Sequence, residues 1–380
     1  MNLGEVRRHF PGLQKGIYLN TGGVGLPSTQ VRAAIEANYS KLYDEYTPPI
    51  EWHTLMCQSA EATRQKLATF LGAGVDELTL SVSTADGYAA VLAGLRWQPG
   101  DEVLITSEEH PMPHQAVLSL EDREGIALKV VKVDHDPNVM LERVEEALTG
   151  RTRMICFSHV TTDTGLRLPA EQICRLARQR GILTLWDGCQ ALAQIPLHLK
   201  EMDCDFYASN CYKWLLGPMG TGILYVSKEA QQILKPLVHP HDPQGGATQY
   251  KTSLPANALY AGVGATIDFI ESIGGIGAIQ QEVVRKTDLL QANLATVPGV
   301  QILSSQRSDS QTGVVTFALS GVDGADLDRA LRNRWQITQR ATYITEPAGV
   351  RISVAFYTSE EELETLVEAV KVLANEAGCG

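Results

Sequence analysis

Lys213 is the residue of this sequence that is hardest to explain as an ordinary surface charge. It stands between Tyr212 and Trp214 at the end of an apolar run, and a glycine-rich turn follows that leads into a second apolar run over residues 222–226. One explanation is that its stem covers apolar surface while the ammonium group reaches water. The other is that flanking strands and the glycine-rich return hold it at the floor of a pocket. A desolvated lysine loses its proton more easily and can act as a nucleophile, a Schiff-base former or a proton carrier.

Polar residues of reactive types also follow the other strands that the sequence predicts. They are Ser83, Thr84, His110, Asp163, Asp187 and Gln190, after predicted strands at 78–82, 102–106, 153–159 and 182–186. In an open parallel sheet, ligands bind beyond the carboxyl ends of the strands. The common position of these residues predicts that they share one site with Lys213.

Two stretches are suited to holding a phosphate or another ligand through the backbone. Ser83 and Thr84 open a predicted helix that runs to Leu95, and the first N–H groups of a helix are free to bind an anion. A hydroxyl at that place can instead cap the helix. The glycines of residues 22–25 allow close approach to a ligand, or form a tight turn without one. The sequence alone leaves both pairs of roles open.

The sequence predicts no metal site. His110 and His114 have the spacing of two ligands on one helix, but the prolines at 111 and 113 are expected to forbid a helix between them. The seven cysteines include no Cys-x-x-Cys pair, so we expect reduced, mostly buried thiols instead of a disulfide framework or a zinc site.

Strands and helices alternate from residue 78 to residue 226, and the strands are apolar on both faces. This pattern predicts an α/β fold whose mainly parallel sheet is covered by helices on both sides. Two helices are expected before it, one capped by Ser28 and one over 54–71, joined by a loop that includes 46–53. Later helices at 258–273, 276–296 and 325–334 and from Ser359, with strands at 314–319 and 350–355, predict a smaller α/β domain. We therefore expect a large domain over 12–255 and a small domain over 256–380 together with 1–11.

The composition excludes some classes of partner. A net charge of −12 over 380 residues argues against nucleic acid, whose binding needs clustered lysine and arginine. No apolar run reaches the length of about 18 residues that spans a bilayer, and the first residues lack the apolar region of a signal peptide. These features predict a cytoplasmic protein with no membrane partner.

Three motifs together carry a resemblance to a known family. They are Tyr18-Leu-Asn-Thr-Gly-Gly, Trp186-Asp187-Gly188-Cys189-Gln190 and Tyr212-Lys213-Trp214-Leu-Leu-Gly-Pro. The chain resembles the fold-type I pyridoxal phosphate (PLP) enzymes of the class V aminotransferase group, from Tyr18 to Arg351. This group includes cysteine desulfurases, carbon–sulfur lyases, kynureninase and isopenicillin epimerases. The resemblance implies a PLP cofactor, a small amino-acid substrate and a homodimer.

The resemblance also implies a role for each matching residue. Lys213 would bind the cofactor aldehyde covalently and later act as the base, Asp187 would pair with the pyridine nitrogen, Gln190 would bind the ring hydroxyl, and His110 would stack on the ring. Thr84, the Ala85 amide, Asn210 and Tyr212 would hold the phosphate, with Ser253 as a candidate from a second subunit. Arg351 would take the substrate carboxylate, since a guanidinium suits a planar carboxylate better than an ammonium does; a salt bridge between domains is the other explanation for it.

Two departures from the family pattern bear on the reaction. The stretch from Ile337 to Gly349 contains no cysteine, whereas cysteine desulfurases carry a sulfur-accepting cysteine shortly before the substrate arginine. The stretch from Thr161 to Gly165 lacks the desulfurase asparagine, which Thr162 or Asp163 could replace. The resemblance is closest to the cysteine and cystine carbon–sulfur lyases, and it implies β-elimination to pyruvate, ammonia and a thiol or persulfide. Transamination, epimerisation, kynureninase-type cleavage and desulfuration are the alternatives.

Overall fold

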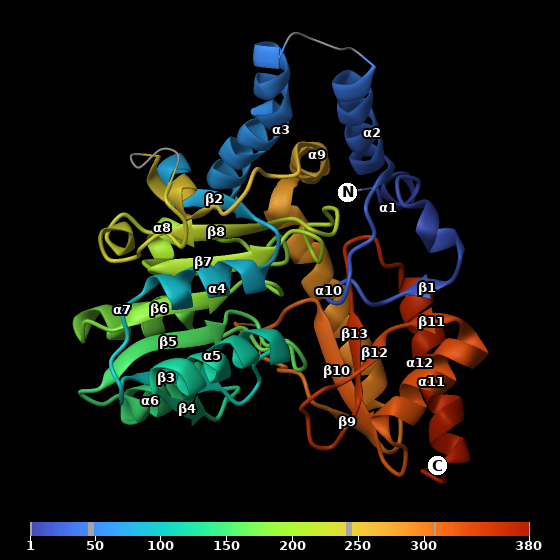
Figure 1. Ribbon diagram of the computed structural model, residues 1–380. Helices are drawn as coiled ribbons and strands as arrows, with labels where there is room; N and C mark the ends of the chain where they lie inside the picture. The colour runs from blue at the N-terminus through green and yellow to red at the C-terminus, as the bar shows by residue number, and fades with distance from the viewer. Residues whose placement is uncertain (1, 45–48, 241–244, 308, 380) are drawn as a thin grey trace.

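A seven-stranded sheet forms the centre of the larger part of the molecule (Figure 1). The computed structural model describes residues 2–44, 49–240, 245–307 and 309–379. The strands lie in the order β2 (Leu78–Ser81), β8 (Gly222–Val226), β7 (Phe206–Asn210), β6 (Leu183–Asp187), β5 (Thr152–Ser158), β3 (Glu102–Thr106) and β4 (Ala127–Val131). The strand β8 runs antiparallel to both of its neighbours, β2 and β7, and the pairs from β7 to β4 are all parallel. The predicted α/β fold with a mainly parallel sheet is therefore confirmed.

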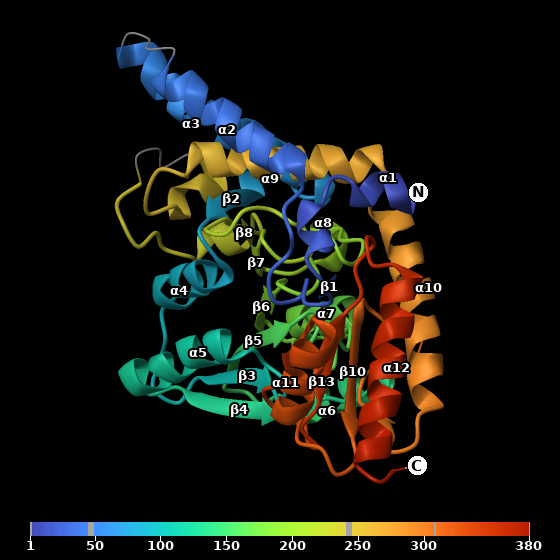
Figure 2. The same cartoon turned by 90° about the vertical axis from the view of Figure 1, so that its right-hand side faces the viewer.

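Helices cover both faces of this sheet, as the apolar strands require (Figure 2). Alternate strand residues point to opposite faces, so Val103 and Met154 pack in the cluster under α4 (Thr84–Gly94) and α5 (Pro111–Glu124). Their neighbours Leu104 and Ile155 pack on the other side. That face is covered by α6 (Pro137–Ala147), α7 (Ala170–Gln179) and the short α8 (Leu199–Met202).

A second, antiparallel sheet of four strands lies beside the first. Its order is β12 (Arg340–Ala341), β13 (Val350–Ser353), β10 (Val314–Leu319) and β9 (Val300–Ile302). The helices α10 (Gly275–Ala295), α11 (Gly324–Trp335) and α12 (Glu360–Glu376) pack against it around Leu290, Phe317 and Leu366. Ser359 caps α12, as expected, and its capping box with Glu362 is complete. These elements form the smaller α/β layer that the sequence predicts.

The N-terminal segment and a long helix connect the two layers. The helix α9 (Asn257–Ser272) packs against α2 (Thr29–Tyr43), which Ser28 caps, and against α3 (Pro49–Phe70). The strand β1 (Ile17–Tyr18) pairs in parallel with β11 (Ile337–Thr338). The remaining elements are α1 (Leu3–Arg7) and the 3-10 helices at Pro11–Gln14, Val75–Glu77, Ala230–Gln232 and Gly246–Tyr250. The domain boundaries given above stay a prediction.

Two expectations about prolines are wrong. The helix α5 begins at Pro111 and contains Pro113, with His110 as its N-cap, and α3 begins at Pro49, within the expected loop 46–53, of which 46–48 lie outside the described residues. A proline in the first turn costs no hydrogen bond, because the N–H groups there have no intrahelical partner. In the described part of the chain no three His, Cys, Asp or Glu side chains gather as metal ligands.

No single described helix is both long and apolar enough to cross a bilayer, although α9 and α10, bent by 72° at the break between them, pass that test as a pair.

Candidate active site

A cavity of about 260 Å³ opens where the carboxyl ends of the central strands face the hairpin of β12 and β13. Most of the residues singled out in the sequence line it. They are Ser83, Thr84, Ala85, His110, Thr162, Asp187, Asn210, Tyr212, Lys213 and Arg351. Residues more than 260 positions apart in the chain thus meet at one sheet edge, as the strand-end argument predicts.

Lys213 lies in the turn between β7 and β8 and is 7% exposed. Its ammonium group has no hydrogen-bond or ion-pair partner among the described residues, although it is this buried. The backbone before it is held by a close approach of the N-terminal turn, because the Gly25 N–H donates to the Tyr212 carbonyl over 2.7 Å. A Cβ on Gly25 would come within 2.1 Å of the Lys213 carbonyl oxygen. The buried lysine, and not the snorkelling one, is the arrangement that the structure has.

Asp187 ends β6 and is buried. One carboxylate oxygen accepts the backbone N–H of Cys189 at 2.8 Å, and the other has no hydrogen-bond partner among the described residues. A buried carboxylate needs a cation or a hydrogen-bond donor to offset the cost of its desolvation. Asp187 is therefore suited to a protonated ring nitrogen of a ligand in the cavity.

His110 lies on the other side of the cavity at the start of α5. Its Nδ1 accepts the backbone N–H of Met112 at 3.2 Å, which leaves the ring held at a fixed angle. Burial and then the charge of Lys213 lower the pKa of His110 to about 4. The imidazole is consequently neutral at neutral pH, and a neutral flat ring is suited to stacking on an aromatic ligand.

The start of α4 resolves the two roles that the sequence left open for Ser83 and Thr84. Ser83 is the N-cap, and its hydroxyl accepts the Asp86 N–H at 3.2 Å. Thr84, which lines the cavity next to Ser83, is not the cap: its backbone N–H donates to Asn210 Oδ1 at 2.9 Å, and its hydroxyl lies 2.7 Å from Cys189 Sγ. The side-chain amide of Asn210 also donates to the Tyr212 hydroxyl at 3.1 Å. These donors gather at a helix start, which is the arrangement that binds a phosphate.

Arg351 occupies the small-domain side of the cavity and is 1% exposed. Its Nη1 donates to the Thr162 carbonyl at 3.0 Å and its Nη2 to Asn20 Oδ1 at 3.1 Å. Nε is buried without a partner, and no carboxylate of the described residues forms an ion pair with the guanidinium. Burial and the neighbouring Arg340 lower the pKa of Arg351 to about 9. A buried cation without a counter-ion is suited to an anionic ligand.

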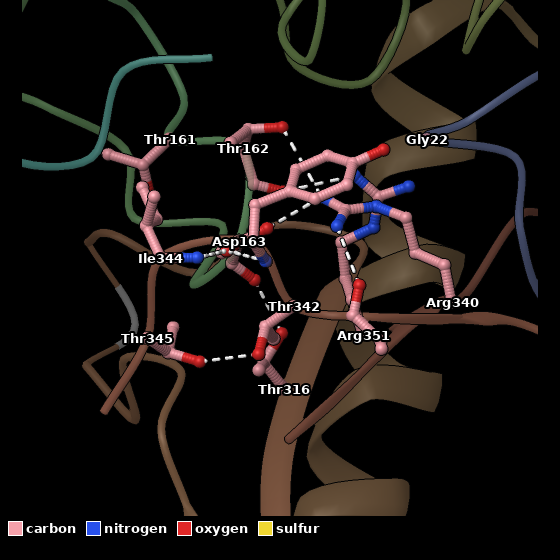
Figure 3. A network of polar contacts seen from close by, with 12 residues as sticks. Gly22, Thr161, Thr162, Asp163, Thr316, Arg340, Thr342, Ile344, Thr345 and Arg351 are labelled. Atoms are coloured by element: carbon pink, nitrogen blue, oxygen red, sulfur yellow. Dashed lines mark hydrogen bonds and ion pairs between the residues drawn. The ribbon is translucent and has the colours of Figure 1, made fainter. Parts of the chain in front are cut away.

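Three residues singled out in the sequence do not line the cavity. Gln190 is buried beside it, where its amide donates to the Gly22 carbonyl and its oxygen accepts the Trp214 indole N–H, each over 2.8 Å. Asp163 is turned toward the backbone of Tyr343 and Ile344 and toward Arg340 (Figure 3). Ser253 is exposed and lines a separate hollow next to Ser81 and Tyr260. The roles implied for these residues stay predictions.

Five lining residues were given no role in the site from the sequence: Met112, Pro113, Cys189, Arg340 and Tyr343. Arg340 is the Cα partner of Arg351 across the pair β12–β13, but the two-residue strand β12 is too short to show a periodic pattern. The Arg340 guanidinium lies 3.8 Å from the centre of the Tyr343 ring, a cation–π contact. The Arg-x-x-Tyr spacing of these two residues is the sequence pattern that could have indicated this contact.

The residues of the cavity fit PLP. A lysine without a partner, a buried carboxylate, a neutral ring and a phosphate-type helix start lie around one space, which is also lined by Arg351 with its unpartnered Nε. The fold and this site define the PLP-dependent enzymes of fold type I. The chain belongs to the aminotransferase class-V family, whose sequence model matches residues 17–366, and its cofactor is PLP.

The chain is similar along almost its whole length to several members of that family. It is 28% identical to a probable cysteine desulfurase of Methanothermobacter thermautotrophicus, covering 98% of each chain. It is 30% identical to an isopenicillin N epimerase of Streptomyces clavuligerus, covering 95% of each. Among solved structures, a C-DES variant with glycine covalently linked to the PLP cofactor matches at a TM-score of 0.88 with 26% identity, covering 98% of this chain and 99% of that one. The cystine C–S lyase C-DES with its product cysteine persulfide matches at 0.87 with 26% identity, covering 95% and 99%.

Proposed function

We propose that this enzyme is a carbon–sulfur lyase that eliminates the β substituent of a cysteine-derived amino acid. The products are pyruvate, ammonia and a thiol or persulfide. The likeness to the cystine C–S lyase C-DES over almost the whole chain supports this reaction. Other relatives are named cysteine desulfurase and isopenicillin N epimerase, so desulfuration and epimerisation are alternative reactions. We choose among the three reactions from the groups in the cavity.

The observation that carries the proposal is the state of the thiols around the cavity. Desulfuration needs a nucleophilic thiolate to accept sulfur. Of the cysteines in the described ranges, Cys189 is the one that lines the cavity, and burial and the negative charge of Asp187 raise its pKa to about 12. The hairpin between β12 and β13 brings Arg340 and Tyr343 to the cavity, and no cysteine. Elimination, in which the sulfur leaves without an acceptor thiol, needs no such group.

Each residue then has a definite task. Arg351 holds the substrate carboxylate and so places the Cα–H bond near Lys213, whose amine takes the proton. The cofactor supplies the electron sink for that step, and Asp187 stabilises a protonated ring nitrogen. The electron pair from the Cα–H bond forms the Cα–Cβ double bond, while the Cβ–S bond breaks and its electrons leave with the sulfur. The remaining three-carbon unit takes up water and leaves as pyruvate and ammonia.

Product analysis tests this reaction against its rivals. We expect pyruvate from at least one of cystine, cysteine and S-methylcysteine, with ammonia in equal amount. Alanine as the product would indicate desulfuration, exchange of the Cα proton without pyruvate would indicate epimerisation, and a keto acid with pyridoxamine phosphate left on the enzyme would indicate transamination. No pyruvate from any of the three substrates would refute the lyase proposal.

We also propose that the active enzyme is a homodimer in which Ser253 reaches the phosphate end of the other subunit's cavity. Exposed apolar side chains lie on elements around this region, including Val82, Met219 and Leu254, and exposed apolar patches are typical of interfaces. Light scattering of the purified holoenzyme measures the oligomeric state. A monomer with full cofactor content would contradict the proposal.

A further inference from the structure

Two arginines, and not one, face the substrate side of the cavity. Arg340 and Arg351 are Cα partners on β12 and β13, and both line the space above Lys213. Two guanidinium groups in one cavity could hold two carboxylates, as in a substrate that is acidic at both ends. Whether they do so depends on the groups that already pair with each of them.

Arg351 is free to take a carboxylate. Its two hydrogen-bond partners are uncharged, since the Thr162 carbonyl and Asn20 Oδ1 accept from its Nη groups, and Nε has no partner. Because such a buried charge is costly unless an anion offsets it, this arginine accounts for one carboxylate of the substrate.

Arg340 is already neutralised by Asp163 (Figure 3). Its Nη2 lies 2.6 Å from Asp163 Oδ1, and its Nη1 donates to the Ala341 carbonyl at 2.8 Å. The ring of Tyr343 covers the guanidinium at 3.8 Å. Both terminal nitrogens that a second carboxylate would need are therefore already paired.

Asp163 cannot turn away from this pair without losing other bonds. It is fully buried, and its second oxygen accepts the backbone N–H groups of Tyr343 at 2.6 Å and Ile344 at 2.8 Å. Its own carbonyl accepts the Thr316 hydroxyl. One aspartate thus fixes the hairpin and the charge of Arg340 at the same time.

On the substrate side, the two positive charges of Arg340 and Arg351 and the one negative charge of buried Asp163 give a net charge of +1. We propose that Asp163 restricts this enzyme to amino acids with a single carboxylate, such as S-substituted cysteines with an uncharged substituent, by holding Arg340 out of a second carboxylate subsite. This inference rests on the proposed function, in which Arg351 holds the substrate carboxylate. Asp163 is then a specificity-determining residue and not a direct substrate ligand.

The test uses ligands that cannot react with the cofactor. The S-carboxymethyl and S-carbamoylmethyl derivatives of β-mercaptopropionate have the same shape and differ in one negative charge, and neither carries an amine. Calorimetric titration of the holoenzyme gives both dissociation constants. We expect the wild type to bind the uncharged amide at least as tightly as the dicarboxylate.

The variant Asp163→Asn should reverse this order. The amide oxygen can still accept the two backbone N–H groups, but its NH₂ group then faces Arg340 and cannot neutralise it. We expect the ratio of the two constants to shift by about tenfold or more toward the dicarboxylate, the effect of one charge-assisted hydrogen-bond pair. The double variant D163N/R340Q should return the ratio to the wild-type value, because the freed guanidinium is gone.

Several outcomes would overturn the inference. They are a wild type that prefers the dicarboxylate by about tenfold, an unchanged ratio in D163N, a preference that survives in D163N/R340Q, and no binding of either ligand to the wild type. If D163N fails to fold, as its melting temperature would show, the double variant D163N/R340Q decides, because it removes the Arg340–Asp163 pair without changing the net charge: its ratio should equal that of the wild type, and a changed ratio overturns the inference. The release of pyruvate is measured separately, so failure of the lyase proposal and failure of this one are distinguishable.

Discussion

The two walls of the cavity are built in different ways. The large-domain wall consists of strand ends that neighbouring strands hold in register, with Ser158 paired to Asp187 and Asp187 to Ala208. The small-domain wall consists of the two-residue strand β12, the strand β13 and the hairpin between them. Side chains hold this hairpin, through Asp163 and through Thr342, which accepts the Gly349 N–H at 3.0 Å.

Under the proposed function, the large-domain wall holds the cofactor and the small-domain wall holds the substrate. A register of backbone hydrogen bonds tolerates most side-chain changes, so the positions of Lys213 and Asp187 depend on the fold. A hairpin held by one aspartate and one threonine changes with a single substitution. The same fold can therefore serve several reactions through changes in the second wall alone.

The largest effect should follow from removing the lysine of the large-domain wall. Lys213→Ala should lower the rate of product formation by at least about 10³-fold, because both covalent attachment of the cofactor and the base are lost. Borohydride reduction and peptide mapping should find the pyridoxyl group on residue 213 of the wild type and on no peptide of the variant.

Lys286 provides the matched control for this experiment. It is also a buried lysine, but its ammonium pairs with Glu282 at 3.1 Å and donates to the Phe356 carbonyl at 2.9 Å. Lys286→Met should lower the melting temperature and leave the pyridoxyl group on residue 213. A pyridoxyl group found on residue 286 would contradict the distinction between the two lysines.

The large-domain wall is also the part of the site that the sequence predicts well. Strand ends follow from apolar runs, and parallel strands place successive ends at one edge, so Thr84, Asp187 and Lys213 could be placed together. The roles of Asp163 and Arg340 could not be predicted, because they depend on the pairing of β12 with β13 and on which way a buried carboxylate turns. The proline errors at 49 and 111 arose from applying the rule for a helix interior to a first turn.

The second largest effect should distinguish the two arginines of the small-domain wall. Arg351→Gln should raise KM about 10- to 100-fold, since a charge-assisted bond worth about 1.5–3 kcal/mol is lost. The double variant D163N/R340Q should raise KM less than about fivefold, because it removes the buried Arg340–Asp163 pair as a neutral unit. Steady-state kinetics with S-methylcysteine measures both. Equal effects of the two variants would show that the arginines bind the substrate jointly.

A smaller effect should separate the structural role of Gln190 from a role in cofactor binding. Gln190→Met keeps the volume but leaves the Gly22 carbonyl and the Trp214 indole N–H without their partners, which should lower the free energy of unfolding of the apoenzyme by about 1–3 kcal/mol. Urea unfolding of the apoenzyme measures this change. Unchanged apoenzyme stability with a large loss of cofactor affinity would instead support the implied bond to the ring hydroxyl.

The smallest effect concerns the acid stability of the large-domain wall. His159 lies next to Asp187, because the backbone N–H of His159 donates to the Asp187 carbonyl at 2.9 Å. Burial lowers the pKa of the His159 imidazole to about 3. Below pH ~6.5 the imidazole of His159 is protonated in the unfolded chain but stays neutral in the folded one. Its contribution to stability is therefore complete above that pH and is lost toward pH ~3, at up to about 1.4 kcal/mol per pH unit.

The comparison of wild type with His159→Gln isolates this contribution from that of Glu109, whose pKa burial raises to about 7. Because folded Glu109 keeps its proton longer than the unfolded chain does, its ionisation makes stability fall as pH rises from ~4.5 to ~7, which is the opposite sign. Urea unfolding of both proteins at pH 7, 6 and 5 gives the difference in the free energy of unfolding. The amount by which the free energy of unfolding of the wild type exceeds that of the variant should shrink with each step to lower pH. The reason is that only the wild type carries the imidazole that becomes free to bind a proton on unfolding. A difference that does not change with pH would mean that the imidazole takes up its proton without unfolding, and that the wall beneath Asp187 is as adaptable as the hairpin opposite.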